Sequence, residues 1–153
     1  MSRDLTGGPP RRWTQELGGI RWLPRLIDKA RAALDGTLGD YLYGHSPVDR
    51  ALLRSLGLGY RDFTAIVEDA ASDDAVLHAL ERRVPDGLIR AREWSRTMPR
   101  TLRVLLLLVD LDDGYFGGPL LLLKPPANAI SGVFTRWLKR RFPSRAAQGR
   151  ARS

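Results

Sequence analysis

The chain contains no cysteine among its 153 residues. Disulfides, thiol nucleophiles and thiolate-bound metals are therefore excluded. Only two histidines are present, His45 and His78, so a zinc site built from several histidines is not expected either. We predict no metal site and no cofactor.

The sequence also lacks a long hydrophobic run. The longest, "VLLLLV" from Val104 to Val109, lies between Arg103 and Asp110 and is far shorter than the roughly 20 residues that span a bilayer. The N-terminus, "MSRDLTGGPPRRW", has early arginines but not the apolar stretch of a signal peptide. We therefore predict a cytoplasmic protein without a transmembrane helix, and peripheral attachment to a membrane is the alternative.

Positive charge is abundant but unevenly distributed. The formal net charge is +8, yet residues 1–98 hold 15 basic and 14 acidic side chains. From Tyr115 onward there are 8 basic residues and no acidic ones. The excess charge thus belongs to the C-terminal end. Arginine outnumbers lysine 22 to 3, which weakens any argument that each arginine serves binding.

Apolar residues repeat at helical spacing through the first 98 residues. The first helix is predicted to begin near Pro24, since proline suits the first helical position, and to end at Gly36. Thr37 is expected to cap a short helical turn through Tyr43. The other start and stop signals are Ser46 with Pro47, Gly57, Ser72, Pro85 and Pro99. The predicted fold class is all-α, a compact bundle of five or six short helices without an alternating strand pattern.

Beyond Pro99 the pattern is less decisive. "TLRVLLLLVDLDDGYFGG" is apolar on every side and fits a buried helix or a strand; helix is preferred because a lone strand would lack partners. "DLDDG", from Asp110 to Gly114, lacks the ligand spacing of an EF-hand loop, so a solvated turn is expected. Asn128 to Phe142 carries an apolar stripe beside basic residues, which predicts a basic amphipathic helix.

Composition divides the chain into five parts. These are an N-terminal arm (1–19), a helical domain (20–98), an apolar extension with a Pro/Gly connector (99–126), the basic amphipathic helix (127–142) and a disordered tail (143–153). The amphipathic helix either docks on the domain or contacts an anionic membrane or nucleic acid. Its candidate contact residues are Arg136, Trp137, Lys139, Arg140 and Arg141.

Two stretches carry a family resemblance. They are "LPRLIDKARAALDGTLGDYLYG", from Leu23 to Gly44, and "DRALLRSLGLGYRDFTAIVEDAASDDAVLHAL", from Asp49 to Leu80. With them the sequence resembles a bacterial family classed as domain of unknown function 5069, over roughly residues 15–97. The resemblance implies a small helical cytoplasmic protein without an established activity, so no catalytic role is carried over. Members of that family often read cysteine-proline after the last glycine, where this chain reads "HSP", so thiol chemistry is not implied here.

Seven residues in the first stretch are candidates for binding a ligand. Arg25 and Lys29 lie one helical turn apart, where like charges repel, so an acidic group should compensate them. One interpretation is a solvated face on which Asp28 pairs with its neighbours. The alternative is a pocket for an anion such as a phosphate or carboxylate. The candidate ligand-binding residues are Arg25, Asp28, Lys29, Arg31, Tyr41, Tyr43 and His45.

His45 is also the candidate general base of this stretch. Asp40 or Asp49 is close enough in sequence to orient it. No nucleophile, metal-ligand set or phosphate-binding loop accompanies it. Helix capping explains Ser46 and Asp49 without catalysis. An enzyme is therefore less favoured than a binding protein.

Three functions remain open from the sequence. The preferred one is a non-catalytic binding or adaptor module with a protein partner. The second is an anionic-metabolite binder, or a small enzyme, that uses the region from Arg25 to Asp49. The third is association with an anionic membrane surface or nucleic acid through the basic C-terminal helix.

Overall fold

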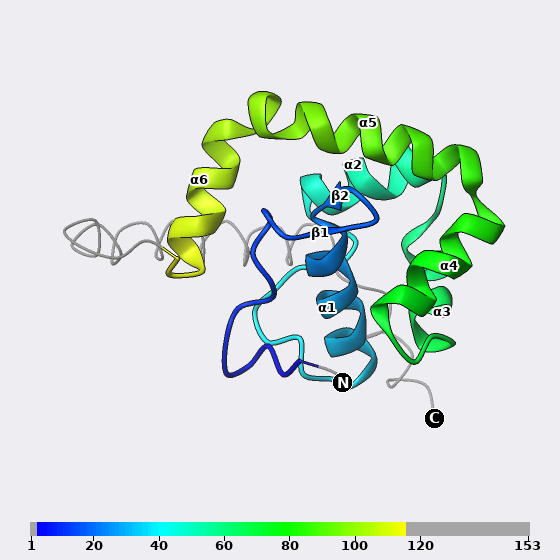
Figure 1. Cartoon of the computed structure of the whole chain (residues 1–153). Coiled ribbons are helices and arrows are strands. Elements are labelled where there is room, and N and C mark those ends of the chain that lie inside the picture. Colours follow the sequence, from blue (N-terminus) through cyan, green and yellow to red (C-terminus); the bar gives the residue numbers. More distant parts are fainter. Residues whose placement is uncertain (1–2, 116–153) are drawn as a thin grey trace, which may run out of the picture.

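The computed structural model describes residues 3–115, and this part of the chain is mainly helical (Figure 1). Its helices are α1 (Leu23–Leu34), α2 (Pro47–Leu56), α3 (Tyr60–Glu68), α4 (Asp73–Arg83), α5 (Pro85–Thr101) and α6 (Arg103–Asp112). Strands β1 (Glu16–Leu17) and β2 (Ile20–Arg21) form a two-residue antiparallel hairpin in which Leu17 faces Ile20. The predicted all-α fold class is confirmed, and α6 is a helix rather than a strand.

The helices surround α1 (Figure 1). α5, the longest helix, runs along the top of this view with α2 packed beneath it; α4 and α3 lie under one end of α5, and α6 descends from the other. Every helix contributes to one apolar core. Its fully or nearly fully buried side chains include Ile20, Leu26, Leu52, Phe63, Leu80, Leu88 and Leu106.

Local sequence signals begin and end several helices as predicted. The Ser46 hydroxyl accepts a hydrogen bond from the Asp49 amide at 3.1 Å, and Pro47 is the first residue of α2. Gly57 ends that helix with φ +75°, a left-handed conformation that glycine adopts without strain. Ser72 caps α4 by accepting from the Ala75 amide at 3.1 Å. These side-chain oxygens satisfy amides that a helix start leaves unpaired.

Two predicted boundaries are wrong. Thr37 caps no helix, because its own backbone is used elsewhere: its amide donates to the Ala32 carbonyl at 2.8 Å, and its carbonyl accepts from the Leu5 amide at 3.0 Å. Residues 37–46 therefore form turns that hold the N-terminal arm. Pro99 does not end α5, which continues to Thr101. Proline removes only one amide donor, and here it lies in the last turn, where the helix is about to end.

Part of the prediction lies outside the described residues. This applies to the connector beyond residue 115, to the basic amphipathic helix at 127–142 with its candidate contact residues, and to the tail at 143–153. Between residues 3 and 115, no helix has the length and apolar character that crossing a membrane requires.

Candidate functional site

The polar face of α1 is buried, like its apolar face. Arg25, Asp28 and Lys29 follow the i, i+3, i+4 spacing of one helix face, and each is at most 5% exposed. The interpretation of this face as a solvated set of ion pairs is therefore wrong. Because a buried charge is tolerated only when it is paired, each of these groups needs a partner from another part of the chain.

Lys29 forms the most deeply buried pair, with Asp49 of α2. The Lys29 ammonium lies 2.5 and 2.6 Å from the two Asp49 carboxylate oxygens and also donates to the Leu42 carbonyl at 3.1 Å. The Gly44 amide donates to Asp49 Oδ2 at 3.1 Å. Burial lowers the pKa of Lys29 below its usual value, and Asp49 opposes this shift. The pair joins α1, the loop at 35–46 and the start of α2.

Trp22 holds this pair from the other side. Its indole N–H donates to Asp49 Oδ1 at 2.8 Å, and its ring lies 5.4 Å from the Lys29 ammonium and 5.1 Å from the Arg25 guanidinium. Trp22 has φ +68°, a left-handed conformation that is strained for a bulky residue. Such strain costs about 1–3 kcal/mol and persists only where the surroundings fix it. Trp22 is thus a buried core residue and also a hydrogen-bond donor to Asp49.

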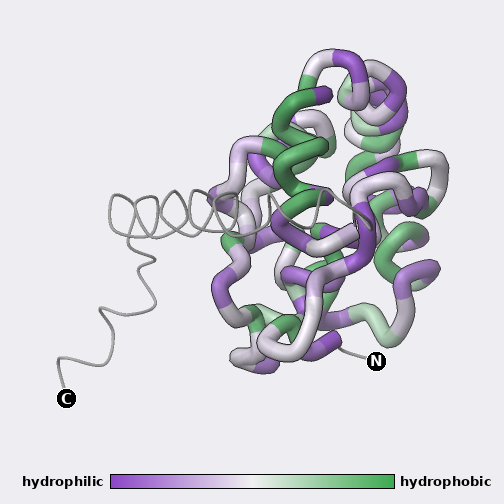
Figure 2. The backbone as a smooth tube through the Cα atoms, turned by 90° about the vertical axis from the view of Figure 1, so that its left-hand side faces the viewer, coloured by the Kyte–Doolittle hydropathy of each residue, from purple (hydrophilic) through white to green (hydrophobic). Residues whose placement is uncertain are grey.

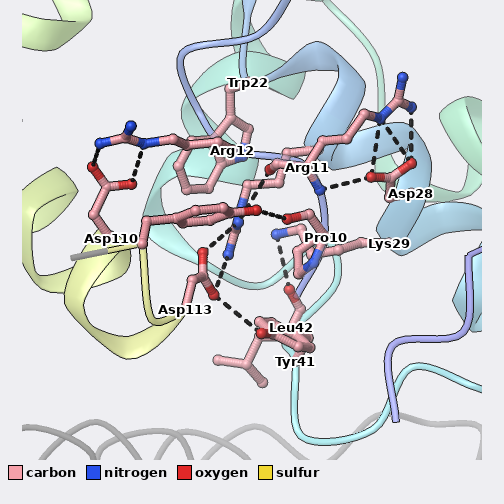
Figure 3. Close-up of polar contacts among 12 residues, drawn as sticks. Pro10, Arg11, Arg12, Trp22, Asp28, Lys29, Tyr41, Leu42, Asp110 and Asp113 are labelled. Atoms are coloured by element: carbon pink, nitrogen blue, oxygen red, sulfur yellow. Dashed lines mark hydrogen bonds and ion pairs between the residues drawn. The ribbon is translucent and has the colours of Figure 1, made fainter. Parts of the chain in front are cut away.

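The Arg25 side chain contacts Asp113, close to the C-terminal end of the described residues. Its Nη1 and Nη2 donate to the Asp113 carboxylate at 2.6 and 3.3 Å, and the Tyr41 hydroxyl donates to the same carboxylate at 3.0 Å (Figure 3). The side chains of Arg25 and Asp113 are 5% and 1% exposed. Burial and the negative charge of Asp113 raise the pKa of Tyr41, so its hydroxyl remains a donor.

Asp28 and Arg31 pair with residues that are distant in the sequence. Arg11, in the N-terminal arm, contacts the Asp28 carboxylate through its amide at 2.8 Å and its guanidinium at 2.8 Å (Figure 3). Asp73, at the start of α4, accepts from Arg11 at 2.5 Å and from Arg31 at 2.6 Å. Burial alone would raise the pKa of Asp73, but the two arginines outweigh it and lower that pKa. The arm is therefore tied to both α1 and α4.

The C-terminal end of α6 completes a network of ion pairs that connects α1 to the N-terminal arm, α2 and α4. Arg12 forms a two-point contact with the Asp110 carboxylate, at 3.1 Å from Nε and 2.7 Å from Nη2 (Figure 3). The Tyr115 hydroxyl donates to the Pro10 carbonyl at 2.9 Å. The solvated turn predicted for "DLDDG" is wrong at Asp110 and Asp113, because both carboxylates are buried, Asp110 against Arg12 of the arm and Asp113 against Arg25.

The remaining candidates lie on one side of this network. The Tyr43 hydroxyl is 2.7 Å from the Thr64 hydroxyl, and its pKa is raised by burial. His45 is exposed, and its ring lies 5.4 Å from that of Tyr60. Asp49, which sequence reasoning placed as a partner for His45, is instead buried against Lys29. The structure therefore brings Arg25, Lys29 and Tyr41 close to shared partners and leaves His45 at the surface.

Sequence reasoning missed the carboxylates and arginines that complete the network. These residues are Arg11, Arg12, Asp73, Asp110 and Asp113. One signal was available: the repulsion between Arg25 and Lys29 required acidic partners, and Asp28 alone could not neutralise both. The sequence did not say which acids would serve, because the partners lie 20 and 88 positions away.

Two surface hollows lie away from the network. One, between α3 and α4, is lined by Ile66, Asp69, Ala70, Ala75, Ala79, Arg82 and Arg83. The other, with a volume of about 420 Å³, lies where α5 meets α6 and is lined by Arg100, Thr101, Leu102, Arg103, Val104, Leu105 and Leu108. Within residues 3–115, no group of three or more acidic or histidine side chains is arranged to hold a metal ion.

Three of the exposed large hydrophobic side chains among residues 3–115 lie on the outer face of α6. Val104, Leu107 and Leu108 are 71, 49 and 54% exposed. They lie at i, i+3 and i+4, so they form one stripe. Figure 2 looks at the side of the molecule that carries α6 and shows this helix as a nearly continuous hydrophobic segment. We call these three residues the α6 stripe.

Comparison with known proteins places the chain in a family. A search of curated proteins finds no significant match. The sequence model of one family matches residues 8–104, a range that contains the predicted resemblance and extends it at both ends. This range holds the hairpin, α1 to α5, and both Arg25 and Lys29, but it ends before Asp110 and Asp113. Because the match covers more than half of its length, the chain belongs to the family described as Domain of unknown function (DUF5069).

Proposed function

We propose that the chain is a non-catalytic binding module that docks a protein partner on the α6 stripe. The observation that carries this proposal is the exposure of Val104, Leu107 and Leu108 on a helix whose other face is packed in the core. An apolar stripe of this kind is typical of a surface that another apolar surface covers. The hollow at the α5–α6 junction adjoins the stripe and offers room for a side chain of the partner.

Charge beside the stripe selects the kind of partner. Arg100 and Arg103 line the hollow together with Val104 and Leu108. A partner with an apolar helix face edged by carboxylates would cover the leucines and neutralise these arginines. A second copy of this chain would bring like charges together and is therefore disfavoured.

The internal pairing of charges supports a role without catalysis. Arg25 is buried and paired with Asp113. Lys29 and Asp49 are buried and paired with each other. A general acid or base must reach the proton that it transfers. His45, the accessible candidate, lies beside Tyr60, whereas the Asp49 carboxylate is buried and paired with Lys29. These contacts favour a binding module over an enzyme.

The test uses a synthetic amphipathic peptide as the probe. One version carries leucines at i, i+3, i+4 and i+7 flanked by glutamates, and the other carries the same leucines flanked by lysines. We expect the full chain to bind the glutamate peptide at least about tenfold more tightly, which corresponds to about 1.4 kcal/mol. Fluorescence anisotropy with a labelled peptide measures both affinities. Equal affinities would contradict charge selection.

A matched pair of variants locates the surface. Leu108→Glu should abolish binding, because it places a carboxylate in the stripe, beside the hollow that Leu108 lines. Ile89→Glu changes a residue of α5 that is 65% exposed but lies outside the stripe, and it should bind like the wild type. Both positions are at the surface, so neither change should alter stability by more than about 0.5 kcal/mol. Equal loss in both variants would refute the stripe as the docking site.

Two further measurements distinguish a protein partner on the α6 stripe from a membrane surface and from a second copy of the chain. Cosedimentation with phosphatidylserine–phosphatidylcholine vesicles that is lost in Leu108→Glu would replace the protein partner with a membrane surface. Sedimentation velocity that shows a wild-type dimer and a Leu108→Glu monomer would replace it with a second copy of the chain. We expect neither result.

A further inference from the structure

We propose that Arg25 and Tyr41 form a carboxylate-binding cradle, which the chain's own Asp113 fills. Asp113 directly follows α6, whereas Arg25 belongs to α1 and Tyr41 to the loop after it. Both carboxylate oxygens are held: Arg25 Nη1 donates to Oδ2 at 2.6 Å, while Arg25 Nη2 and the Tyr41 hydroxyl donate to Oδ1 at 3.3 and 3.0 Å. A two-point arginine contact of this kind can also recognise a free carboxylate.

The Arg25 side chain of the cradle is buried and has one donor nitrogen without a partner among the described residues. Arg25 is 4% exposed, and its guanidinium lies 5.1 Å from the centre of the Trp22 ring and 5.8 Å from that of Tyr41. Its Nε is buried and has no hydrogen-bond partner among the described residues. A buried donor without an acceptor is costly. Arg25 thus keeps one buried donor that the Asp113 carboxylate does not reach.

The two donor residues of the cradle lie inside the family-matched segment, and the carboxylate that they bind lies outside it. Arg25 and Tyr41 lie within residues 8–104, the segment that matches the family, and Asp113 lies beyond it. The same holds for Arg12 and its acceptor Asp110. The family segment therefore supplies the cationic donors, and the last turn of α6 supplies the anions. A carboxylate from another molecule would serve the same donors wherever Asp113 is withdrawn.

The attachment of α6 allows such a withdrawal. Among the described elements, α6 packs mainly on α5, and its C-terminal end is fastened by the polar contacts of Asp110, Asp113 and Tyr115. Its apolar anchor, Leu106, lies one turn before Asp110. Release of the last turn therefore frees the cradle while Leu106 stays in the core. The ligand class is a small carboxylate, which competes with Asp113 for Arg25 and Tyr41.

Chemical rescue of the full chain tests the cradle. Asp113→Ala removes the internal carboxylate and should lower Tm. Sodium acetate should then restore most of the lost Tm, whereas sodium chloride at equal ionic strength should not. Asp113→Ala combined with Arg25→Met should not respond to acetate, because the two-point donor is absent. The proposal is overturned if acetate stabilises both variants equally or acts no better than chloride.

Inorganic phosphate and Asp110→Ala complete the design. If phosphate restores Asp113→Ala better than acetate does, the assignment to carboxylates is wrong. Asp110→Ala removes the partner of Arg12, whose side chain is 38% exposed, so acetate should have no selective effect there. The peptide affinity of Asp113→Ala should match that of the wild type, which keeps this test separate from docking on the α6 stripe.

A second variant covers the case in which Asp113→Ala does not fold. Asp113→Asn keeps the shape of the side chain but loses its charge, so it remains a weaker occupant of the cradle. Acetate should displace it and increase amide hydrogen exchange at residues 109–113 severalfold relative to chloride. Exchange that is the same in both salts would overturn the proposal.

Discussion

At the residue scale, the pairing of Lys29 with Asp49 determines what a single substitution costs. Lys29→Met leaves the Asp49 carboxylate buried at 0% exposure without its cation. Breaking a buried pair in this way costs about 3–5 kcal/mol. We therefore expect Lys29→Met to lower the free energy of unfolding by that amount in urea denaturation.

The double variant separates pairing from packing. Lys29→Met with Asp49→Asn removes both charges and keeps the approximate volume of each side chain. Because no charge is then left alone, its stability loss should be smaller than the sum of the two single losses. Additive losses would show that the two residues act independently, against the contacts of 2.5 and 2.6 Å.

Tyr43 should make stability depend on alkaline pH. Its pKa is raised above the ordinary value of 10.0, chiefly by burial, so the folded state retains a proton that the unfolded state loses. The contribution of Tyr43 is thus fully present below pH 10 and falls as the pH rises above it. The stability difference between the wild type and Tyr43→Phe, measured by urea unfolding, should be constant below pH 10 and shrink above it. A difference independent of pH would contradict this assignment.

The single-residue chemistry was only partly predictable from the sequence. Arg25 and Lys29 stood out because like charges one turn apart require compensation, and that requirement is met. The acids that meet it could not be chosen, because Asp49 also fits a capping role and Asp113 also fits a solvated turn. Whether a carboxylate caps, faces water or enters a core depends on packing that local spacing does not encode.

At the element scale, Gly87 sets the distance between α5 and α2. A Cβ at this position would lie 2.2 Å from the Leu56 carbonyl oxygen, a backbone atom that cannot rotate away. Gly87→Ala should therefore push the two helices apart and cost about 1–3 kcal/mol, as other overpacked cores do. Gly8→Ala, which meets nothing within 4 Å, is the matched control. Thermal unfolding should show a lower Tm for Gly87→Ala alone; equal Tm values would contradict close packing.

Helix boundaries were predictable where the signal is local. Ser46 and Ser72 cap their helices because the acceptor oxygen and the amide that it satisfies lie three residues apart. Thr37 has the same signature and caps nothing, since its carbonyl accepts from Leu5 in the N-terminal arm. The arm contact is a tertiary one, and it overrides the local preference of the loop.

At the scale of the whole molecule, the N-terminal arm and the end of α6 jointly cover the polar face of α1. The arm supplies Arg11 and Arg12, and α6 supplies Asp110 and Asp113. The sequence predicted the arm and the apolar extension as separate parts. Their meeting over α1 could not be predicted, because it depends on contacts between positions as far apart as Pro10 and Tyr115.

These contacts between the N-terminal arm, α1 and the end of α6 also predict the effect of shortening the chain. A version that ends at Val104 keeps the whole family-matched segment but lacks the core residue Leu106 and the acids that pair with Arg12 and Arg25. A version that ends at Tyr115 keeps these pairs and the contact with Pro10. Because a loss of ~1 kcal/mol lowers Tm by roughly 4–8 °C in a small domain, we expect the shorter version to unfold at least that much earlier. Calorimetry of the two versions measures the difference. Equal Tm values would mean that α6 adds no stability to the domain, and that the buried carboxylates are not what holds the arm on α1.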